Sequence, residues 1–373
     1  MRFPSFPHRA RFSTFRFLLV SVLLTGALMP LAARTQSIKN FPKTAATEIA
    51  IKDENASDEF VNVYSYRQPH LVAPLFEKFT QRTGIGVRVI FAKKGLIERV
   101  AAEGRNSPAD VLLTVDISRL INAADSVAQP VRSSVLDKHI PAAARSPEDL
   151  WFALTYRARV AYVSRARVQQ DSLSYGALAE PIFKGRICTR SGHHPYNNAL
   201  FASQLAHLGE PAFRAWLTGL KNNLSEKPSG GDRTQVRRIY AGSCDVAISN
   251  TYYMGKMQTN TKKPEQQDWA RTVRIIFPDA KGRGTHVNVS GMVMAKYAPN
   301  RQNAQKLMEF LVSEEAQRLY AEVNFEYPVR AGVAQSALVA GWGKLKADPI
   351  ALETIAAFRK RASEIVDEIG FNN

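Results

Sequence analysis

The sequence predicts an α/β fold built as two lobes. Strand-like and helix-like segments alternate in the first half of the chain, and the same alternation returns after a connector that contains three prolines. About 315 residues follow the N-terminal leader, which is more than a single hydrophobic core usually serves. We expect one lobe at 58–153 plus about 279–330, and the other at 154–278 plus about 331–373.

The N-terminus carries the pattern of a secretory signal. Four arginines precede the apolar run 17–24, and the small residues that follow end at Ala33. This pattern predicts a signal peptide over 1–33. Residues 34–57 show no periodicity and are expected to form a flexible leader. No later segment has the length that a membrane span requires, so we expect the mature chain to be soluble.

The first half of the chain contains a βαβαβ pattern. Apolar residues recur with helical spacing from Leu71 to Phe79, and Gly84 ends this helix. The other expected elements are strands at 61–64, 87–91 and 110–114 and a helix at 96–102. Such a unit predicts a mainly parallel sheet with right-handed crossovers. Ligands of parallel sheets bind beyond the carboxyl ends of the strands, where Tyr64–Arg67 and Val115–Asp116 stand.

The second half repeats the alternation with longer helices. The expected strands are 151–154, 160–163, 246–248, 272–277 and 287–294, and the expected helices are 200–208, 213–220, 236–240, 304–311 and 349–369. We expect the strands at 272–277 and 287–294 to cross back toward the first lobe.

Two cysteines occur in the whole chain, Cys188 and Cys244. An even pair in an exported protein indicates a disulfide. Closing a loop of about 57 residues would stabilise the fold by about 4 kcal/mol in the chain-entropy picture. The alternative is a pair of buried free thiols.

Two adjacent tyrosines, Tyr252 and Tyr253, follow the apolar run 246–248 and are candidate metal ligands. A deprotonated phenol is a hard oxygen ligand that suits a trivalent cation such as Fe3+, whereas softer metals call for Cys or His. The two phenols converge only if the backbone turns, and we expect Gly255 to permit that turn. The alternative is a tyrosine pair that is half core and half surface, which is common in strands.

Charge and motifs argue against two classes of function. The formal net charge is +17, but the basic residues are scattered, without an aromatic-interleaved stripe or zinc-finger spacing, so no nucleic-acid partner is expected. No Gly-x-Ser-x-Gly or His-Glu-x-x-His motif occurs, which disfavours a secreted hydrolase. The charge favours acidic ligands or anionic surfaces.

Five segments carry a resemblance to a known family. They are 63–69 (Val-Tyr-Ser-Tyr-Arg-Gln-Pro), 190–197 (Arg-Ser-Gly-His-His-Pro-Tyr-Asn), 244–253 (Cys-Asp-Val-Ala-Ile-Ser-Asn-Thr-Tyr-Tyr), 288–291 (Asn-Val-Ser-Gly) and 326–329 (Glu-Tyr-Pro-Val). With these segments in this order, the chain resembles the periplasmic ferric-ion-binding proteins, the solute receptors of iron ABC importers. The resemblance implies the two-lobed type II periplasmic binding fold, with a hinge and an interlobe cleft.

The resemblance also implies a ligand set. In that family, phenolates of the C-terminal lobe bind the ferric ion, and the matching positions are Tyr196, Tyr252 and Tyr253. One branch of the family adds a His and a Tyr from the first lobe, but Gln68–Pro69 stands at that place here. Tyr66 is the candidate substitute, although it could equally pack against the lobe or bind an anion.

Carbonate or another small anion completes the iron site in the family, and Arg67 and Arg157 are the candidates to hold it here. The resemblance further implies a monomeric periplasmic receptor that is not an enzyme and that delivers Fe3+ to the permease of an ABC importer in the inner membrane. The alternative is a receptor of the same fold for an organic or oxyanion solute, with the tyrosines as walls of its site.

Overall fold

The computed structural model describes residues 47–52 and 59–373. The predicted signal peptide, 1–33, lies outside these residues, and so does most of the expected leader. Within the described part, no helix is both long and apolar enough to cross a membrane.

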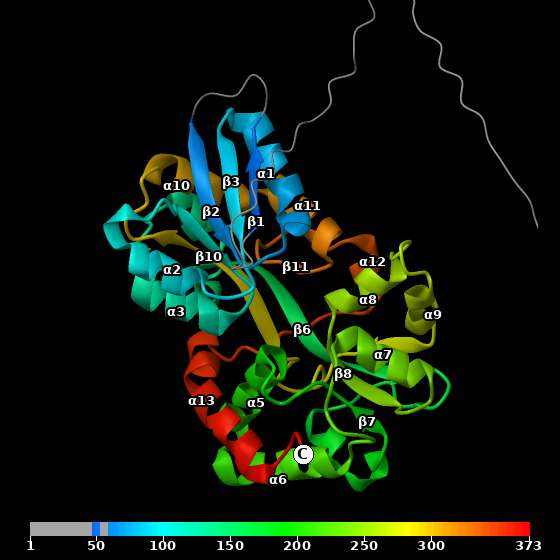
Figure 1. Ribbon diagram of the computed structural model, residues 1–373. Helices are drawn as coiled ribbons and strands as arrows, with labels where there is room; N and C mark the ends of the chain where they lie inside the picture. Colours follow the sequence, from blue (N-terminus) through cyan, green and yellow to red (C-terminus); the bar gives the residue numbers. More distant parts are fainter. Residues whose placement is uncertain (1–46, 53–58) are drawn as a thin grey trace, which may run out of the picture. The chain divides into compact units, whose positions relative to one another are not determined.

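Among the described residues, the strands form one continuous hydrogen-bonded sheet in the order β1-β3-β2-β4-β10-β6-β8-β7 (Figure 1). Strands β9 and β11 also pair with β6, and β5 pairs with β10. The strands are β1 Thr47–Ile51, β2 Phe60–Ser65, β3 Gly86–Phe91, β4 Val111–Thr114, β5 Ala128–Gln129, β6 Phe152–Ser164, β7 Ile187–Cys188, β8 Val246–Asn250, β9 Val273–Ile276, β10 Val287–Ala295 and β11 Tyr327–Pro328.

Helices of the described part surround this sheet (Figure 1), and the central strands β4, β8 and β10 are consequently buried at every position. The helices are α1 Pro69–Thr83, α2 Leu96–Glu103, α3 Ile117–Val127, α4 Ser134–His139, α5 Pro195–Leu208, α6 Glu210–Asn222, α7 Asp232–Tyr240, α8 Tyr252–Gln258, α9 Glu265–Arg271, α10 Arg301–Leu311, α11 Glu314–Asn324, α12 Ala337–Ala340 and α13 Leu352–Ile369.

The predicted βαβαβ unit is confirmed by β2, α1, β3, α2 and β4. Strand β2 pairs in parallel with both β3 and β4. Gly84 ends α1 in the left-handed conformation, with φ of 73°, as the sequence predicts. On either side of this parallel trio, β1 and β10 pair antiparallel, so the expectation of a mainly parallel sheet holds for the trio but not for the strands that flank it.

Part of the range 34–57, which was expected to be a flexible leader, forms strand β1. Residues Thr47–Ile51 pair antiparallel with β3 from Thr47 opposite Phe91 to Ile51 opposite Val87, and they form the edge of the sheet. The prediction was wrong for these residues because none of the β1 side chains is buried. Backbone hydrogen bonds hold this strand, and they leave no periodic signal in the sequence.

Strand β6 is continuous from Phe152 to Ser164, where the sequence predicted two separate strands. It pairs with β10 and β11 near its beginning and with β8 and β9 near its end. Strand β10 pairs with both β4 and β6, which confirms the expected crossing back toward the first part. Strand β9 pairs with the end of β6, on the edge opposite β8, and does not cross back, so that expectation was wrong.

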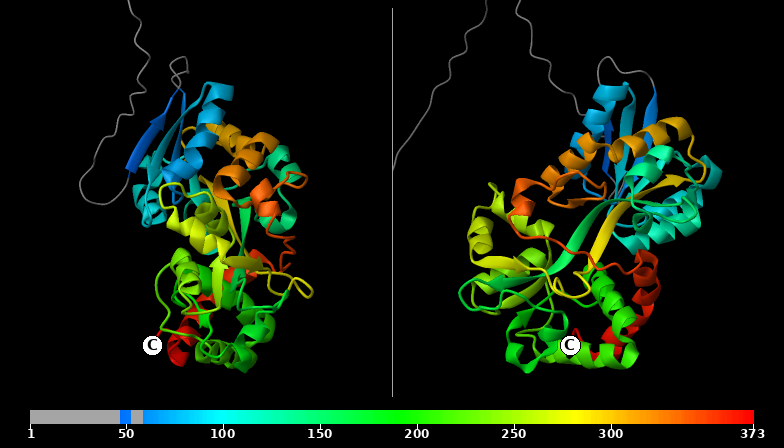
Figure 2. Two further views of the ribbon diagram at one scale, coloured as in Figure 1. Left: turned by 90° about the vertical axis from the view of Figure 1, so that its right-hand side faces the viewer. Right: turned by 180° about the vertical axis from the view of Figure 1, so that it is seen from behind.

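The C-terminal helix α13 packs against α5 and also contacts α3, and Figures 1 and 2 show it in red beside the green α5. The described residues belong to one compact unit. The lobe limits expected from the sequence stay a prediction. Strands β6 and β10 pair with each other and join the elements of the two expected lobes.

Candidate tyrosine-lined metal site

The tyrosine pair lies where β8 ends and α8 begins. Strand β8 ends at Asn250, and Tyr252 and Tyr253 form the first turn of α8. The turn expected at Gly255 is wrong, because Gly255 is inside this helix. A Cβ at Gly255 would lie 2.4 Å from Cγ of Phe325, so glycine serves close packing here. The start of the helix, not a glycine turn, aims the two phenols.

Tyr196 meets this pair from the first turn of α5. The Tyr252 hydroxyl donates a hydrogen bond to the Tyr196 hydroxyl across 3.1 Å. The ring centroids of Tyr252 and Tyr253 are 4.4 Å apart. His194 caps α5 by accepting the backbone N–H of Tyr196 at 3.2 Å. Burial lowers the pKa of His194 to about 3, so the ring is neutral and its Nδ1 is available as an acceptor. The three predicted phenols thus lie together.

The predicted disulfide is confirmed between Cys188 and Cys244, whose Cα atoms are 5.9 Å apart. Cys188 ends β7, and Cys244 stands two residues before β8. The bond therefore joins the strand that leads toward Tyr196 to the strand that leads toward Tyr252.

A cavity of about 210 Å³ opens at the three phenols. Its lining residues come from both of the predicted lobes, so the cavity lies between the elements expected to form them. The lining residues are Tyr66, Arg67, Gln68, Leu71, Val115, Arg157, Tyr196, Arg233, Tyr252, Tyr253, Lys256 and Glu326.

Burial keeps two of the phenols protonated in the absence of a cation. It raises the pKa of Tyr252 well above 10, with a further rise from the neighbouring tyrosines. Burial, followed by the charge of Asp232, raises the pKa of Tyr253 to about 12. These oxygens become ligands only when a cation displaces their protons, which a highly charged metal ion can do.

Asp232 organises the polar layer behind the phenols. Its carboxylate accepts from Arg159 Nη1 at 2.8 Å, from Arg190 Nη1 at 3.1 Å and from the backbone N–H of Asn250 at 3.0 Å. Asn250 and Thr251, which precede the tyrosine pair in sequence, are candidates to orient the phenols from behind. Instead the Asn250 side chain accepts from Arg159, and the Thr251 hydroxyl accepts from a backbone N–H in β6.

Both predicted anion-binding arginines line the cavity, but both already have partners. Arg67 Nη2 donates to the two carboxylate oxygens of Glu326 at 3.0 and 3.1 Å. Arg157 donates through Nη1 to Ser290 at 3.1 Å and through Nη2 to the backbone carbonyl of Val115. Each arginine retains a buried Nε–H without a partner among the described residues. Each side chain therefore keeps one unsatisfied donor beside its existing partners.

Tyr66 is a wall of the cavity whose hydroxyl points elsewhere. Its oxygen accepts from the backbone N–H groups of Leu96 and Ile97, each at 3.0 Å, at the start of α2. Burial raises the pKa of this phenol. The structure thus matches the packing alternative for Tyr66, and we leave it out of the ligand set.

Three charged residues of the cavity were given no role from the sequence. Lys256 lies one helical turn beyond Tyr252, and burial followed by the Arg67 charge lowers its pKa to about 8. The guanidinium of Arg233 lies 5.4 Å from the centre of the Tyr253 ring. Glu326 is buried, which opposes ionisation, but the Arg67 and Arg157 charges lower its pKa overall, so it stays ionised.

The donor set of the site is unusual for a divalent metal. Among the described residues, no group of three or more His, Cys, Asp or Glu side chains is placed to hold a metal ion. His193, near Tyr196 in sequence, bonds Ser363 and Asp367 on the surface instead. Phenol oxygens are therefore the ligands that this cavity offers, and they favour a hard trivalent cation.

The chain is similar to known solute-binding proteins. Residues 95–343 match the family described as bacterial extracellular solute-binding protein. The chain is 42% identical over 324 residues to iron uptake protein A1 of Synechocystis, which covers 86% of this chain and 90% of the relative.

Solved structures are similar over most of the chain. Apo ferric ion-binding protein A of Pasteurella haemolytica has 50% identity and a TM-score of 0.79, covering 84% of this chain and 99% of that chain. A Trichodesmium protein in complex with iron and citrate ligands has 39% identity and a TM-score of 0.80, with the same coverage. The fold is thus the two-lobed type II periplasmic binding fold, and these relatives are described by uptake or binding of iron, not by catalysis.

Proposed function

Because the chain belongs to the family of bacterial extracellular solute-binding proteins, we propose that it is a periplasmic receptor for Fe3+. Tyr196, Tyr252 and Tyr253 bind the ion as phenolates. The observation that carries this proposal is the 3.1 Å approach of the Tyr196 and Tyr252 hydroxyls, with the Tyr253 ring in contact with that of Tyr252. Phenols drawn from two distant segments meet in a cavity where a cation can replace their protons.

Charge in the cavity supports an accompanying anion. Three phenolates neutralise one Fe3+, and Glu326 neutralises Arg67. Arg157, Arg233 and Lys256 then remain as positive charges without a carboxylate among the cavity's described lining residues. Carbonate or another small anion balances part of this charge and fills the coordination positions that three phenolates leave open.

In this proposal the protein binds Fe3+ and delivers it without catalysing a reaction. Fe3+ binds the tyrosines of the C-terminal lobe, and the lobe that carries Arg67 and Val115 closes over it by bending at β6 and β10, the strands common to both parts. The closed monomer delivers the ion to the permease of an ABC importer in the inner membrane. Arg67 and Arg157 hold the anion, and Tyr66 shapes the wall.

Titration of the mature protein with a ferric chelate tests the proposal. We expect a visible band from phenolate-to-iron charge transfer, which weakens in Tyr252→Phe and Tyr253→Phe and disappears in the double variant. Tyr240→Phe is the matched control, because Tyr240 is 51% exposed on α7 and does not line the cavity. Iron binding at full strength in the double variant would remove the tyrosine site.

The same cationic cavity supports the alternative of an organic or oxyanion solute without metal. Mass spectrometry and metal analysis of protein taken from its native compartment separate the two. A bound organic or oxyanion solute with no iron would favour the alternative.

A further inference from the structure

The paired strands β6 and β11 border a different cavity on each face. Tyr327 of β11 stands directly opposite Tyr156 of β6. Successive side chains of a strand point to opposite faces. Arg157 and Glu326, each next to one of these tyrosines in sequence, line the proposed iron cavity, whereas the two tyrosines line a separate pocket. This second pocket thus lies behind the strands that border the first.

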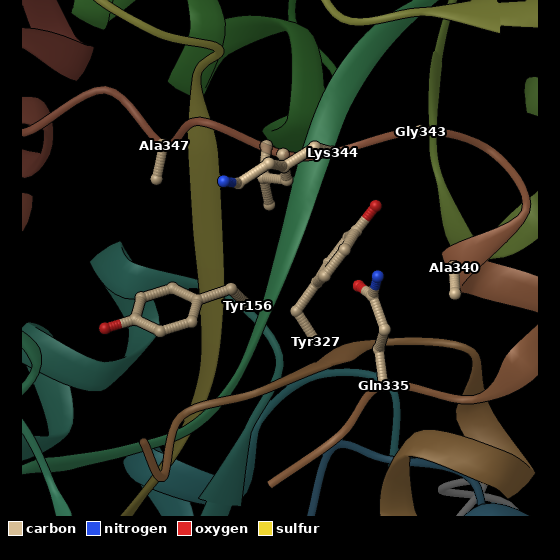
Figure 3. A pocket seen from close by; sticks show the side chains of 8 residues that line it. Tyr156, Tyr327, Gln335, Ala340, Gly343, Lys344 and Ala347 are labelled. Atoms are coloured by element: carbon tan, nitrogen blue, oxygen red, sulfur yellow. The ribbon is translucent and has the colours of Figure 1, made fainter. Parts of the chain in front are cut away.

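The second pocket has the size of a ligand site. Its volume is about 360 Å³, within the range of pockets that hold small molecules. Figure 3 shows Tyr327 between Tyr156 and Gln335, with the segment that carries Gly343, Lys344 and Ala347 across from it. No residue of this pocket lines the iron cavity.

The lining specifies the chemistry of a ligand. Two phenol rings stand at opposite positions of paired strands, with Tyr156 half-buried and Tyr327 7% exposed, and Leu345 and Ala340 extend the apolar part of the lining. Among the described lining residues, Lys344 is the only charged one, and Gln335 adds an amide. A planar body therefore suits the tyrosine side, and a negative group suits the lysine side.

The tyrosines themselves are neutral partners. Burial raises the pKa of both Tyr156 and Tyr327, so neither competes with a ligand as an anion. The Tyr327 hydroxyl is buried and has no hydrogen-bond partner among the described residues. An unpaired buried hydroxyl costs free energy, and a ligand acceptor recovers that cost only if the Tyr327 side chain shifts to expose its oxygen.

We propose that this pocket is a second binding site, for a small aromatic carboxylate. The ring of the ligand stacks on Tyr156 and Tyr327, and its carboxylate pairs with Lys344 and Gln335. The site lies on the face of β6 and β11 opposite the iron cavity, so it is separate from any anion that accompanies Fe3+.

Benzoate and its neutral isostere benzamide are the probes for this site. Saturation-transfer NMR and calorimetry with the mature, iron-free protein should show saturable benzoate binding that is tighter than benzamide binding. Lys344→Ala should weaken benzoate binding two- to fivefold, the range of a single solvent-exposed ion pair. Ala340→Phe should abolish it by filling the pocket.

Two variants control for the other cationic site and for charge alone. Lys256→Ala removes a lysine from the iron cavity, and Lys263→Ala removes an exposed lysine that lines neither space. Both should leave benzoate binding unchanged. Loss of binding in Lys256→Ala but not in Lys344→Ala would place benzoate in the iron cavity and overturn the proposal. Equal affinity for benzamide, or no saturable binding at 10 mM, would also overturn it.

Discussion

Proton competition gives the sharpest test of the tyrosine ligands. If Fe3+ binds three phenolates, it must displace one proton from each, so its apparent affinity falls as the pH falls. Substituting one of these tyrosines by phenylalanine removes one displaced proton. The pH dependence of iron binding in Tyr253→Phe must therefore be less steep than in the parent protein.

The magnitude follows from the environment of Tyr253. Its pKa is raised from the ordinary value of 10.0 to about 12, chiefly by burial. Each pKa unit corresponds to about 1.4 kcal/mol, so burial adds about 3 kcal/mol to the cost of deprotonation, and at pH 7 the whole cost is about 7 kcal/mol. Throughout pH 5–8 this phenol is protonated in the iron-free protein, so the displaced proton should contribute about one full decade of affinity per pH unit.

The assay compares two proteins under identical competition. Citrate competes for iron with the parent protein and, separately, with Tyr253→Phe, and the charge-transfer band or bound iron is measured from pH 5 to 8. Protonation of citrate and hydrolysis of free iron affect both titrations equally and cancel in the ratio of affinities. The parent-to-variant ratio should fall about tenfold for each unit by which the pH falls.

A ratio that stays constant across this pH range would refute the reasoning, because it would mean that Tyr253 loses no proton when iron binds. Tyr240→Phe supplies the baseline, since its exposed phenol lies outside the cavity. The ratio of parent to Tyr240→Phe should be independent of pH.

Three stability predictions follow from buried groups. Glu326→Gln should lower the free energy of unfolding in urea by about 3–5 kcal/mol, because it leaves the buried Arg67 without its counter-ion. Replacing both Cys188 and Cys244 by alanine should cost about 2–5 kcal/mol in the same assay. Tyr327→Phe should leave stability unchanged or raise it by about 1 kcal/mol, because it deletes a buried hydroxyl that has no partner.

Matched variants separate these effects from surface changes. Glu314→Gln removes an exposed carboxylate paired with Arg318 and should cost less than about 1 kcal/mol. A similar small loss for Glu326→Gln would contradict the buried-pair argument. Dithiothreitol should destabilise the parent protein but not the double cysteine variant. A clear loss of stability in Tyr327→Phe would mean that its hydroxyl does have a partner, such as an ordered water.

Elements whose apolar residues recur with a clear period could be predicted from the sequence, and elements without such a period could not. Helix α1 shows apolar spacing and a terminal glycine, and both features are local. Strand β1 was missed because its contribution is backbone pairing with a strand that lies far away in sequence. The full length of β6 was missed because the polar residues Thr155 to Arg159 interrupt its apolar pattern, although Thr155, Arg157 and Arg159 are buried.

In the candidate site, too, features marked by local sequence could be predicted, and features that depend on distant contacts could not. The resemblance of short segments predicted that Tyr196 would join the tyrosine pair, and the cysteine count predicted the disulfide near them. Lys256 was missed because α8 was not expected as a helix, and only a helix brings residues four apart onto one face. Glu326 was quoted within a motif, but its partner Arg67 is 259 residues away, and no local spacing reveals such a pairing.

The disulfide makes the alignment of the proposed metal site depend on an oxidising environment. Between β7 and β8 only two residue pairs are in register, Ile187 with Val246 and Cys188 with Ala247. In a reducing environment the covalent link is absent, and this short ladder, with hydrogen bonds such as those of Asp232 to Arg190 and Asn250, aligns the segments that carry Tyr196 and Tyr252. Oxidation of the two cysteines fixes that alignment covalently. On the proposed function, the oxidised protein should bind Fe3+ more strongly than the reduced protein, and titration with a ferric chelate before and after reduction measures the difference.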